Sequence, residues 1–269
     1  MNTPHDRSAW LQGGEATCHT PPARPVQPRR IVLLGPPGIG KGTQAGLLDA
    51  AFGACYLSTG AIFRHAQAEC PSGGGSAIRT ALDYTRRGDS VPDDTLLELI
   101  NERLRCLTCS GGFILDGFPR TVQQAKLLDL LLESRELALD AVILYELPPS
   151  LIIPRLLGRR ICPTCHRFYH VKNRPPHATD VCDDCLTPLV QLTTDRIDTI
   201  RLISGHHLRN SQPLLNYYRQ RKLLVAVSAV GSPEEVFERT IDAFKMTPRG
   251  SPAGTGSHHP AATIDRPGG

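Results

Sequence analysis

The sequence predicts an α/β fold in which helices cover both faces of a parallel sheet. Short apolar runs of four to six residues alternate with helical patterns along residues 30–246. The runs are continuous rather than alternating, which is typical of strands buried on both faces, as in a parallel sheet. A glycine-rich turn follows the first run and opens a helix, the context in which a phosphate loop is found. Together these observations favour a three-layer P-loop fold.

The individual elements can be placed in chain order. The predicted strands are Arg30–Leu34, Gly112–Leu115, Asp140–Tyr145 and Leu223–Val227. A helix is predicted over Lys41–Phe52, and another is predicted to begin after the last strand. The start of this second helix is indicated by Pro233 in its first turn and by acidic residues near the positive end of the helix dipole. Thr59–Val91, mostly helical, and Ile161–Leu192, rich in Cys and Pro, interrupt this rhythm. We interpret each as an insertion over the edge of the sheet.

Composition excludes several classes of protein. With 40% hydrophobic residues among 269, the chain can bury a sizeable core, so it is not disordered throughout. The net charge of +4 suits a protein with local anion sites and does not indicate a nucleic-acid binder. No apolar run approaches the ~20 residues that span a membrane. The first residues lack the apolar stretch of a secretory signal, so we expect a cytoplasmic protein, and a monomer, although the sequence leaves self-association undecided.

Both ends of the sequence differ from the part between them. Residues 1–29 contain five prolines and no periodic apolar pattern, and residues 247–269 are rich in Pro, Gly, Ser and His. Both segments are predicted to be disordered extensions. The folded domain is therefore expected to span residues 30–246.

A phosphate loop is predicted over residues 35–43, Gly-Pro-Pro-Gly-Ile-Gly-Lys-Gly-Thr. Its glycines allow backbone N–H groups to turn towards phosphate oxygens, the following helix adds the positive end of its dipole, and Lys41 can reach the β- and γ-phosphates. Gly42 stands where most such loops have Ser or Thr, and Thr43 comes one place later. The hydroxyl that usually binds Mg²⁺ is thus displaced.

The form of this loop resembles that of nucleoside monophosphate kinases, and further segments resemble adenylate kinases with a long lid. In the order of that family they are Leu57-Ser58-Thr59-Gly60 with Arg64, Leu115–Thr121 with Gln124, Gly158-Arg159-Arg160, and Gln212-Pro213-Leu214-Leu215 with Tyr217 and Tyr218. The resemblance covers residues 30–246. It implies a helical monophosphate-binding insert over residues 58–91, a lid over residues 159–195, and the reaction ATP + AMP ⇌ 2 ADP with Mg²⁺ bound to ATP.

The resemblance also implies roles for single residues. The expected catalytic residues are Lys41, Arg64, Asp116, Arg120, Arg155 and Arg159. The expected ATP-binding residues are Gly38, Ile39, Gly40, Lys41, Gly42, Thr43, Arg155, Arg159, Phe168 and Tyr169. The expected AMP-binding residues are Thr59, Gly60, Arg64, Asp89, Ser90, Val91, Gly117, Phe118, Pro119, Arg120 and Gln124. Arginines suit this chemistry because a guanidinium stays charged and can grip phosphate oxygens with two hydrogen bonds.

Four cysteines predict a structural metal site in the lid. Cys162 and Cys165 form one Cys-x2-Cys pair, Cys182 and Cys185 form another, and sixteen residues separate the pairs. This spacing is typical of a closed four-thiolate zinc site, which leaves no open position for catalysis. Four thiolates can also bind iron, and we expect zinc because the site is structural. The remaining Cys106-x2-Cys109 has no partner pair and is interpreted as two half-buried thiols.

The resemblance breaks at three positions. Counting back from Gln212-Pro213 without gaps, the two lid arginines of the family fall on Leu192 and Ile203, and Ala61 stands where the family commonly has Asp. Arg196, Arg201 and Arg209 lie nearby and are candidate substitutes. A transition-state arginine is worth ~10³–10⁵ in rate, so a slow enzyme is one expectation. The alternatives are a nucleotide- and zinc-binding protein without turnover, and a kinase for another nucleoside monophosphate.

Overall fold

A five-stranded parallel sheet forms the centre of the molecule. The computed structural model describes residues 28–60, 76–87, 91–102, 111–165, 167–192, 195 and 211–246. The strand order is β2-β3-β1-β4-β7, with β1 in the middle. The strands are β1 (Arg29–Leu34), β2 (Cys55–Ser58), β3 (Gly112–Asp116), β4 (Ala141–Glu146) and β7 (Leu224–Ser228). The α/β prediction is therefore confirmed.

The predicted strands agree with the observed ones to within one residue at either end. Arg29, which we assigned to the N-terminal extension, lies in β1 and pairs with Gly112 of β3. Strand β2 was not predicted, because it has only four residues and two of them are polar or weakly apolar. It pairs with β3 so that Ser58 lies beside Asp116. This pairing brings the start of the first insertion next to the end of β3.

Helices follow the strands. They are α2 (Lys41–Phe52), α4 (Ser76–Arg87), α5 (Asp93–Asn101), α7 (Val122–Glu133), α8 (Pro149–Leu157) and α10 (Pro233–Met246), and residues 211–220 are also helical. Helix α2 has the predicted bounds, and α10 begins at the predicted proline. A capping box explains the start of α10: the Ser232 N–H donates to Glu235 Oε2 (2.8 Å), and the Glu235 N–H donates to Ser232 Oγ (3.2 Å).

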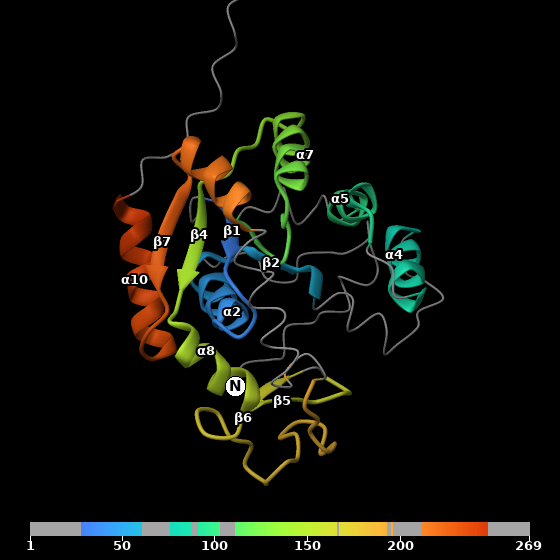
Figure 1. Ribbon diagram of the computed structural model, residues 1–269, viewed down its shortest axis with the longest axis vertical. Coiled ribbons are helices and arrows are strands. Elements are labelled where there is room, and N and C mark those ends of the chain that lie inside the picture. Colours follow the sequence, from blue (N-terminus) through green and yellow to red (C-terminus); the bar gives the residue numbers. More distant parts are fainter. Residues whose placement is uncertain are drawn as a thin grey trace, which may run out of the picture.

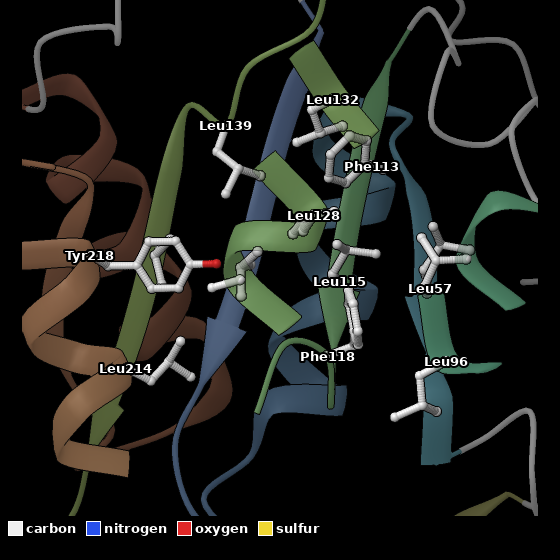
Figure 2. Packing of buried hydrophobic residues seen from close by; sticks show 14 residues of the cluster. Leu57, Leu96, Phe113, Leu115, Phe118, Leu128, Leu132, Leu139, Leu214 and Tyr218 are labelled. Carbon is white, nitrogen blue, oxygen red and sulfur yellow. The ribbon is translucent and has the colours of Figure 1, made fainter. Parts of the chain in front are cut away.

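Two apolar clusters fill the space between the sheet and its helices. One joins the sheet to α2 and α10. The other joins the opposite face of the sheet to α5, α7 and the helix of residues 211–220. In Figure 2, Leu214 and Tyr218 of that last helix and Leu128 and Leu132 of α7 point into this second cluster. The molecule thus has three layers, with the sheet in the middle.

The described elements within and beside the two predicted insertions lie apart from the sheet centre. Figure 1 shows α4 and α5 beyond strand β2, and the hairpin of β5 (Arg159–Ile161) and β6 (Phe168–His170) beyond the end of α8. The parts of residues 161–192 that the structure describes contain no helix, as expected. The predicted tails, residues 1–27 and 247–269, lie outside the described residues. Among the helices that the structure describes, none is long and apolar enough to cross a membrane.

Candidate functional site

The glycine-rich loop connects the central strand β1 to helix α2, at the carboxyl edge of the sheet. Gly38 has a φ of +80°, and a Cβ there would lie 2.5 Å from the side chain of Leu156 on α8, so only glycine fits. Ile39 is buried and anchors the loop to the core. Gly40 precedes α2 without a side chain that could cap it, so the first amides of the helix remain available to an anion.

The side chain of Lys41 folds back against the loop that precedes helix α2. Its Nζ donates to the carbonyl oxygens of Gly35 (2.8 Å) and Pro36 (3.2 Å). Nζ is also 3.9 Å from Oδ1 of Asp116. Burial lowers the pKa of the Lys41 ammonium and the charges of Arg120 and Arg159 lower it further, while Asp116 opposes them. The positive charge is therefore concentrated at a point where little water competes with a phosphate for it.

Asp116 ends strand β3 and faces the same loop. The pairing of Asp116 with Leu33 of β1 places its carboxylate at the carboxyl edge of the sheet. The Tyr56 hydroxyl donates to its second oxygen, Oδ2 (3.1 Å). A protein usually holds Mg²⁺ with one or two carboxylates plus the phosphates of the substrate. The Asp116 carboxylate is only partly buried and lies beside the phosphate loop, so the donor set present here fits Mg²⁺.

A group of polar side chains lies next to this loop, where β2 and β3 end. A Cβ at Gly117, where φ is +86°, would lie 2.6 Å from Thr59 Oγ1. That Oγ1 is buried and has no hydrogen-bond partner among the described residues, which is unusual for a buried hydroxyl. The exposed Arg120 donates from Nε to the carbonyl oxygen of Gly117 (2.7 Å). Phe118 and Pro119, joined by a cis peptide bond, are buried below them.

The buried side-chain amide of Gln124 lies next to Arg120 in this group of polar side chains. Its Oε1 accepts from the Arg120 N–H (2.6 Å), and its Nε2 donates to Asp93 Oδ1 (2.7 Å). The Gln124 backbone N–H donates to Oγ1 of Thr121, which caps α7 and fixes the start of that helix. One amide hydrogen and one lone pair of the Gln124 side chain remain, enough to read the edge of a base. Sequence reasoning found Gln124 but missed Asp93, which orients it.

The two arginines near the lid have different partners. Arg155 on α8 donates to the carbonyl oxygens of Ile39 (3.3 Å) and Ala229 (3.2 Å), so it lies against the phosphate loop. Arg159 makes two hydrogen bonds, of 2.5 and 2.7 Å, to the buried carboxylate of Asp195. Its guanidinium also lies 5.4 Å from the ring centre of Phe168. In this structure Arg159 is therefore held by the lid rather than by the loop.

Several predicted site residues lie outside the described residues. They are Arg64, Asp89 and Ser90, together with the candidate substitutes Arg196, Arg201 and Arg209. The departures Ala61 and Ile203 and the thiols of Cys106 and Cys109 also lie outside the described residues. Of the other predicted AMP-binding positions, Gly60 follows Thr59 directly, and Val91 is half-buried against the cluster that includes α5 and α7. Of the predicted ATP-binding positions, Gly42 and Thr43 are exposed in the first turn of α2.

The four lid cysteines converge as predicted. The sulfurs of Cys162, Cys165, Cys182 and Cys185 all lie within 4.8 Å of one another, and Cys165 Sγ is 3.6 Å from Cys182 Sγ. Four sulfurs around a tetrahedral zinc ion, each ~2.3 Å from it, are about 3.8 Å apart. Although burial opposes ionisation, hydrogen bonds from the Tyr169 hydroxyl and from the backbone of Cys185 and Asp184 lower the pKa of Cys182 to about 6. Burial raises the pKa of Cys165, so the support for a metal site comes from the positions of the four sulfurs. The cluster can therefore hold a structural zinc ion.

Tyr169 belongs to this cluster rather than to the nucleotide side. The ring is buried, its hydroxyl lies 3.4 Å from Cys182 Sγ, and that hydroxyl accepts from the Asp183 N–H (3.0 Å). This position does not fit the aromatic contact with the donor nucleotide that we predicted. The reason is the alternation of side chains along strand β6, which directs Phe168 and Tyr169 to opposite faces. Of these two residues, it is Phe168 that shares a face of the hairpin with Arg159.

Comparison with known proteins identifies the family. A family model described as Adenylate kinase matches residues 33–223. A protein named Adenylate kinase from Clostridium kluyveri (strain NBRC 12016) is 38% identical over 216 residues, which are 80% of this chain and 97% of the relative. The chain is also similar to a protein named Adenylate kinase from Clostridium novyi, with 40% identity over 78% of this chain and 95% of the relative. A third, from Caldanaerobacter subterraneus subsp. tengcongensis, is 38% identical over 78% of this chain and 93% of the relative. The chain therefore belongs to the adenylate kinase family.

Proposed function

We propose that this chain catalyses the reversible transfer of the terminal phosphoryl group of ATP to AMP, giving two molecules of ADP. The observation that carries the proposal is the convergence of three charged groups. Lys41, Asp116 and Arg120 follow β1 and β3, the two neighbouring strands at the middle of the sheet. Ligands of open α/β sheets bind at this edge, outside the carboxyl ends of the strands. The unsatisfied hydroxyl of Thr59 beside them supports a second, acceptor site.

Phosphoryl transfer needs positioning and charge neutralisation more than covalent help. The amides of residues 38–43 and the Lys41 ammonium would hold the donor phosphates, and Arg120, with Arg64, would hold the phosphate of AMP. When Mg²⁺ is bound with ATP, it neutralises charge on the phosphate oxygens, and Asp116 would orient it. The terminal phosphoryl group of ATP would then be transferred to the phosphate of AMP among the positive charges of Lys41, Arg64 and Arg120.

The lid would close over the donor and exclude water. Arg155 already contacts the phosphate loop, whereas Arg159 is paired with Asp195. We infer that closure lets Arg159 exchange part of this pairing for phosphate oxygens, while Phe168 contributes an aromatic face to the nucleotide. Tyr169 would contribute only its backbone. Exclusion of water protects the donor phosphate from hydrolysis during transfer.

The division of the chain follows from these roles. We propose a core from residue 30 to residue 246 that carries two inserts, a monophosphate-binding insert over residues 58–91 and a zinc lid over residues 159–195. Residues 1–29 would precede this core, with Arg29 already part of strand β1, and residues 247–269 would follow it. A monomer is sufficient for the reaction, because every group named here comes from one chain. A cytoplasmic location suits an enzyme whose substrates are the adenine nucleotides.

A coupled assay of ADP formation tests the proposed activity. With ATP and Mg²⁺, we expect AMP to be phosphorylated at least 10-fold faster than CMP, UMP or GMP, because the Thr59 hydroxyl and the Gln124 amide can pair with the edge of adenine. The control is Gln124→Leu, which should lower the preference for AMP. Equal rates with all four monophosphates would contradict the assignment of adenine, and no ADP formation with any of them would contradict the kinase.

The lid provides a second test. Arginine at both Leu192 and Ile203 is expected to raise kcat about 10-fold or more, because each restores a positive charge near the transferred group. Leu130→Arg, which adds the same charge at an exposed position on α7, should leave kcat unchanged. Steady-state kinetics with ATP and AMP measures both variants. An unchanged or lower kcat in the lid variant would indicate that Arg196 or Arg201 already serves this purpose.

A further inference from the structure

The phosphate loop lacks a hydroxyl at its usual place, and a tyrosine from another strand fills the space beside it. Gly42 follows Lys41 where phosphate loops generally carry the Ser or Thr that binds Mg²⁺. A Cβ built on Gly42 would lie 3.4 Å from the Tyr56 hydroxyl. Thr43, the next residue, is exposed. The atom that a side chain at Gly42 would meet is therefore the Tyr56 hydroxyl.

Tyr56 is held firmly in this position. It lies in β2, where its backbone pairs with Ile114 of β3, two residues before Asp116. Its ring is partly buried against the apolar cluster of α2 and the sheet. A phenol fixed at both its backbone and its ring can hold a hydrogen-bond partner in one orientation at little cost in side-chain entropy.

The partner of Tyr56 is the carboxylate predicted to orient Mg²⁺. The two oxygens of Asp116 face different groups: the Tyr56 hydroxyl donates to Oδ2 (3.1 Å), and Oδ1 faces the Lys41 ammonium at 3.9 Å. Contacts on both oxygens fix the plane of the carboxylate. Groups that hold a metal-orienting carboxylate typically change metal affinity 10- to 100-fold when they are removed.

We propose that Tyr56 is a positioning residue for Mg²⁺–ATP, which acts by holding the Asp116 carboxylate towards the phosphate loop. The proposal rests on the proposed function, because it assumes that the loop binds the phosphates of ATP. Tyr56 contributes a hydrogen-bond donor and no ligand to the ion.

Calorimetry without AMP tests this role in the absence of turnover. The affinity of the full chain for ATP is measured twice, once with saturating Mn²⁺ and once in EDTA. The quantity compared between variants is the ratio of the first affinity to the second. We expect Tyr56→Phe to lower this ratio about 10-fold, while the affinity for ATP in EDTA changes less than 2-fold. In turnover assays the variant should need more Mg²⁺ for half-maximal rate.

The matched control is Tyr145→Phe. Tyr145 lies in the same cluster. Its backbone carbonyl lies next to Gly35 of the loop, but its hydroxyl, the only group that the substitution removes, is bonded to Thr240 of α10 (3.1 Å). Loss of that hydroxyl should lower the unfolding temperature and leave the ratio unchanged. A ratio in Tyr56→Phe equal to that of the unaltered chain, or lowered equally in both variants, would overturn the proposal. Failure of the proposed function would differ, since the unaltered chain would then bind no ATP or form no ADP from ATP and AMP.

Discussion

Alanine in place of Lys41 is expected to lower kcat for ADP formation by roughly 10³-fold. The Lys41 ammonium lies among the carbonyl oxygens of the loop and next to Asp116, so removal of the side chain takes away the positive charge at this point of the loop. The charge that spreads over the transferred group would then lack its closest counterion. Because this charge develops in the transition state, kcat should fall much more than the affinity for ATP.

The stability of the same variant separates a catalytic role from a structural one. Burial lowers the pKa of Lys41, which means that the folded chain disfavours the charge. Removal of the ammonium should therefore leave the unfolding temperature unchanged or raise it. Lys126→Ala, at an exposed position on α7, serves as the control for loss of a lysine. A Lys41→Ala protein that keeps more than a tenth of the turnover would contradict the assigned role.

The sequence was sufficient for the central elements because their signals are local. Each predicted strand is a continuous apolar run, which only a strand with two covered faces accommodates in so few residues. The loop of residues 35–43 is equally local, since its glycines and Lys41 act within nine positions. The four lid cysteines were predictable for the same reason: a zinc site needs two short pairs, and their spacing is visible in the sequence.

The parts that the sequence did not predict depend on contacts between distant segments. Strand β2 is a strand because it pairs with β3, and its own four residues carry little signal. Asp93 reaches Gln124 from 31 residues away, and Tyr56 reaches Asp116 from 60. Tyr169 was assigned to the donor nucleotide from the family resemblance, and the face that its side chain occupies depends on the register of β5 and β6, which the sequence does not reveal. No local pattern encodes such pairings.

Serine in place of Cys182 is expected to abolish tight zinc binding and to unfold the lid while the sheet stays folded. The unaltered chain should contain about one zinc ion, and the variant far less than one. The apolar interior of the lid consists of Cys162, Tyr169 and Cys182, with three partly buried neighbours. Structural zinc contributes ~10–16 kcal/mol of apparent binding free energy in small peptides, far more than this interior can supply by apolar contact.

Metal analysis, together with thermal unfolding, measures this effect. Cys55→Ser is the matched control, because Cys55 lies on β2 outside the cluster and its loss should leave the zinc content unchanged. The Cys182→Ser protein should show a separate, early transition of the lid and a main transition close to that of the control. A full equivalent of zinc in the variant would refute the four-thiolate site, and iron in the unaltered chain would refute the choice of metal.

The same variant connects the zinc site to turnover. Arg159 begins strand β5, so its position depends on the pairing of β5 with β6, and β6 is held through the contact of Tyr169 with Cys182. Loss of zinc would therefore misplace Arg159 and Phe168 together, so that neither would reach the donor when the lid closes. Because displacement of a positioning group by about 1 Å can cost ~10²-fold in rate, we expect kcat to fall by about that factor. ATP affinity, which depends on the loop and Lys41, should fall much less.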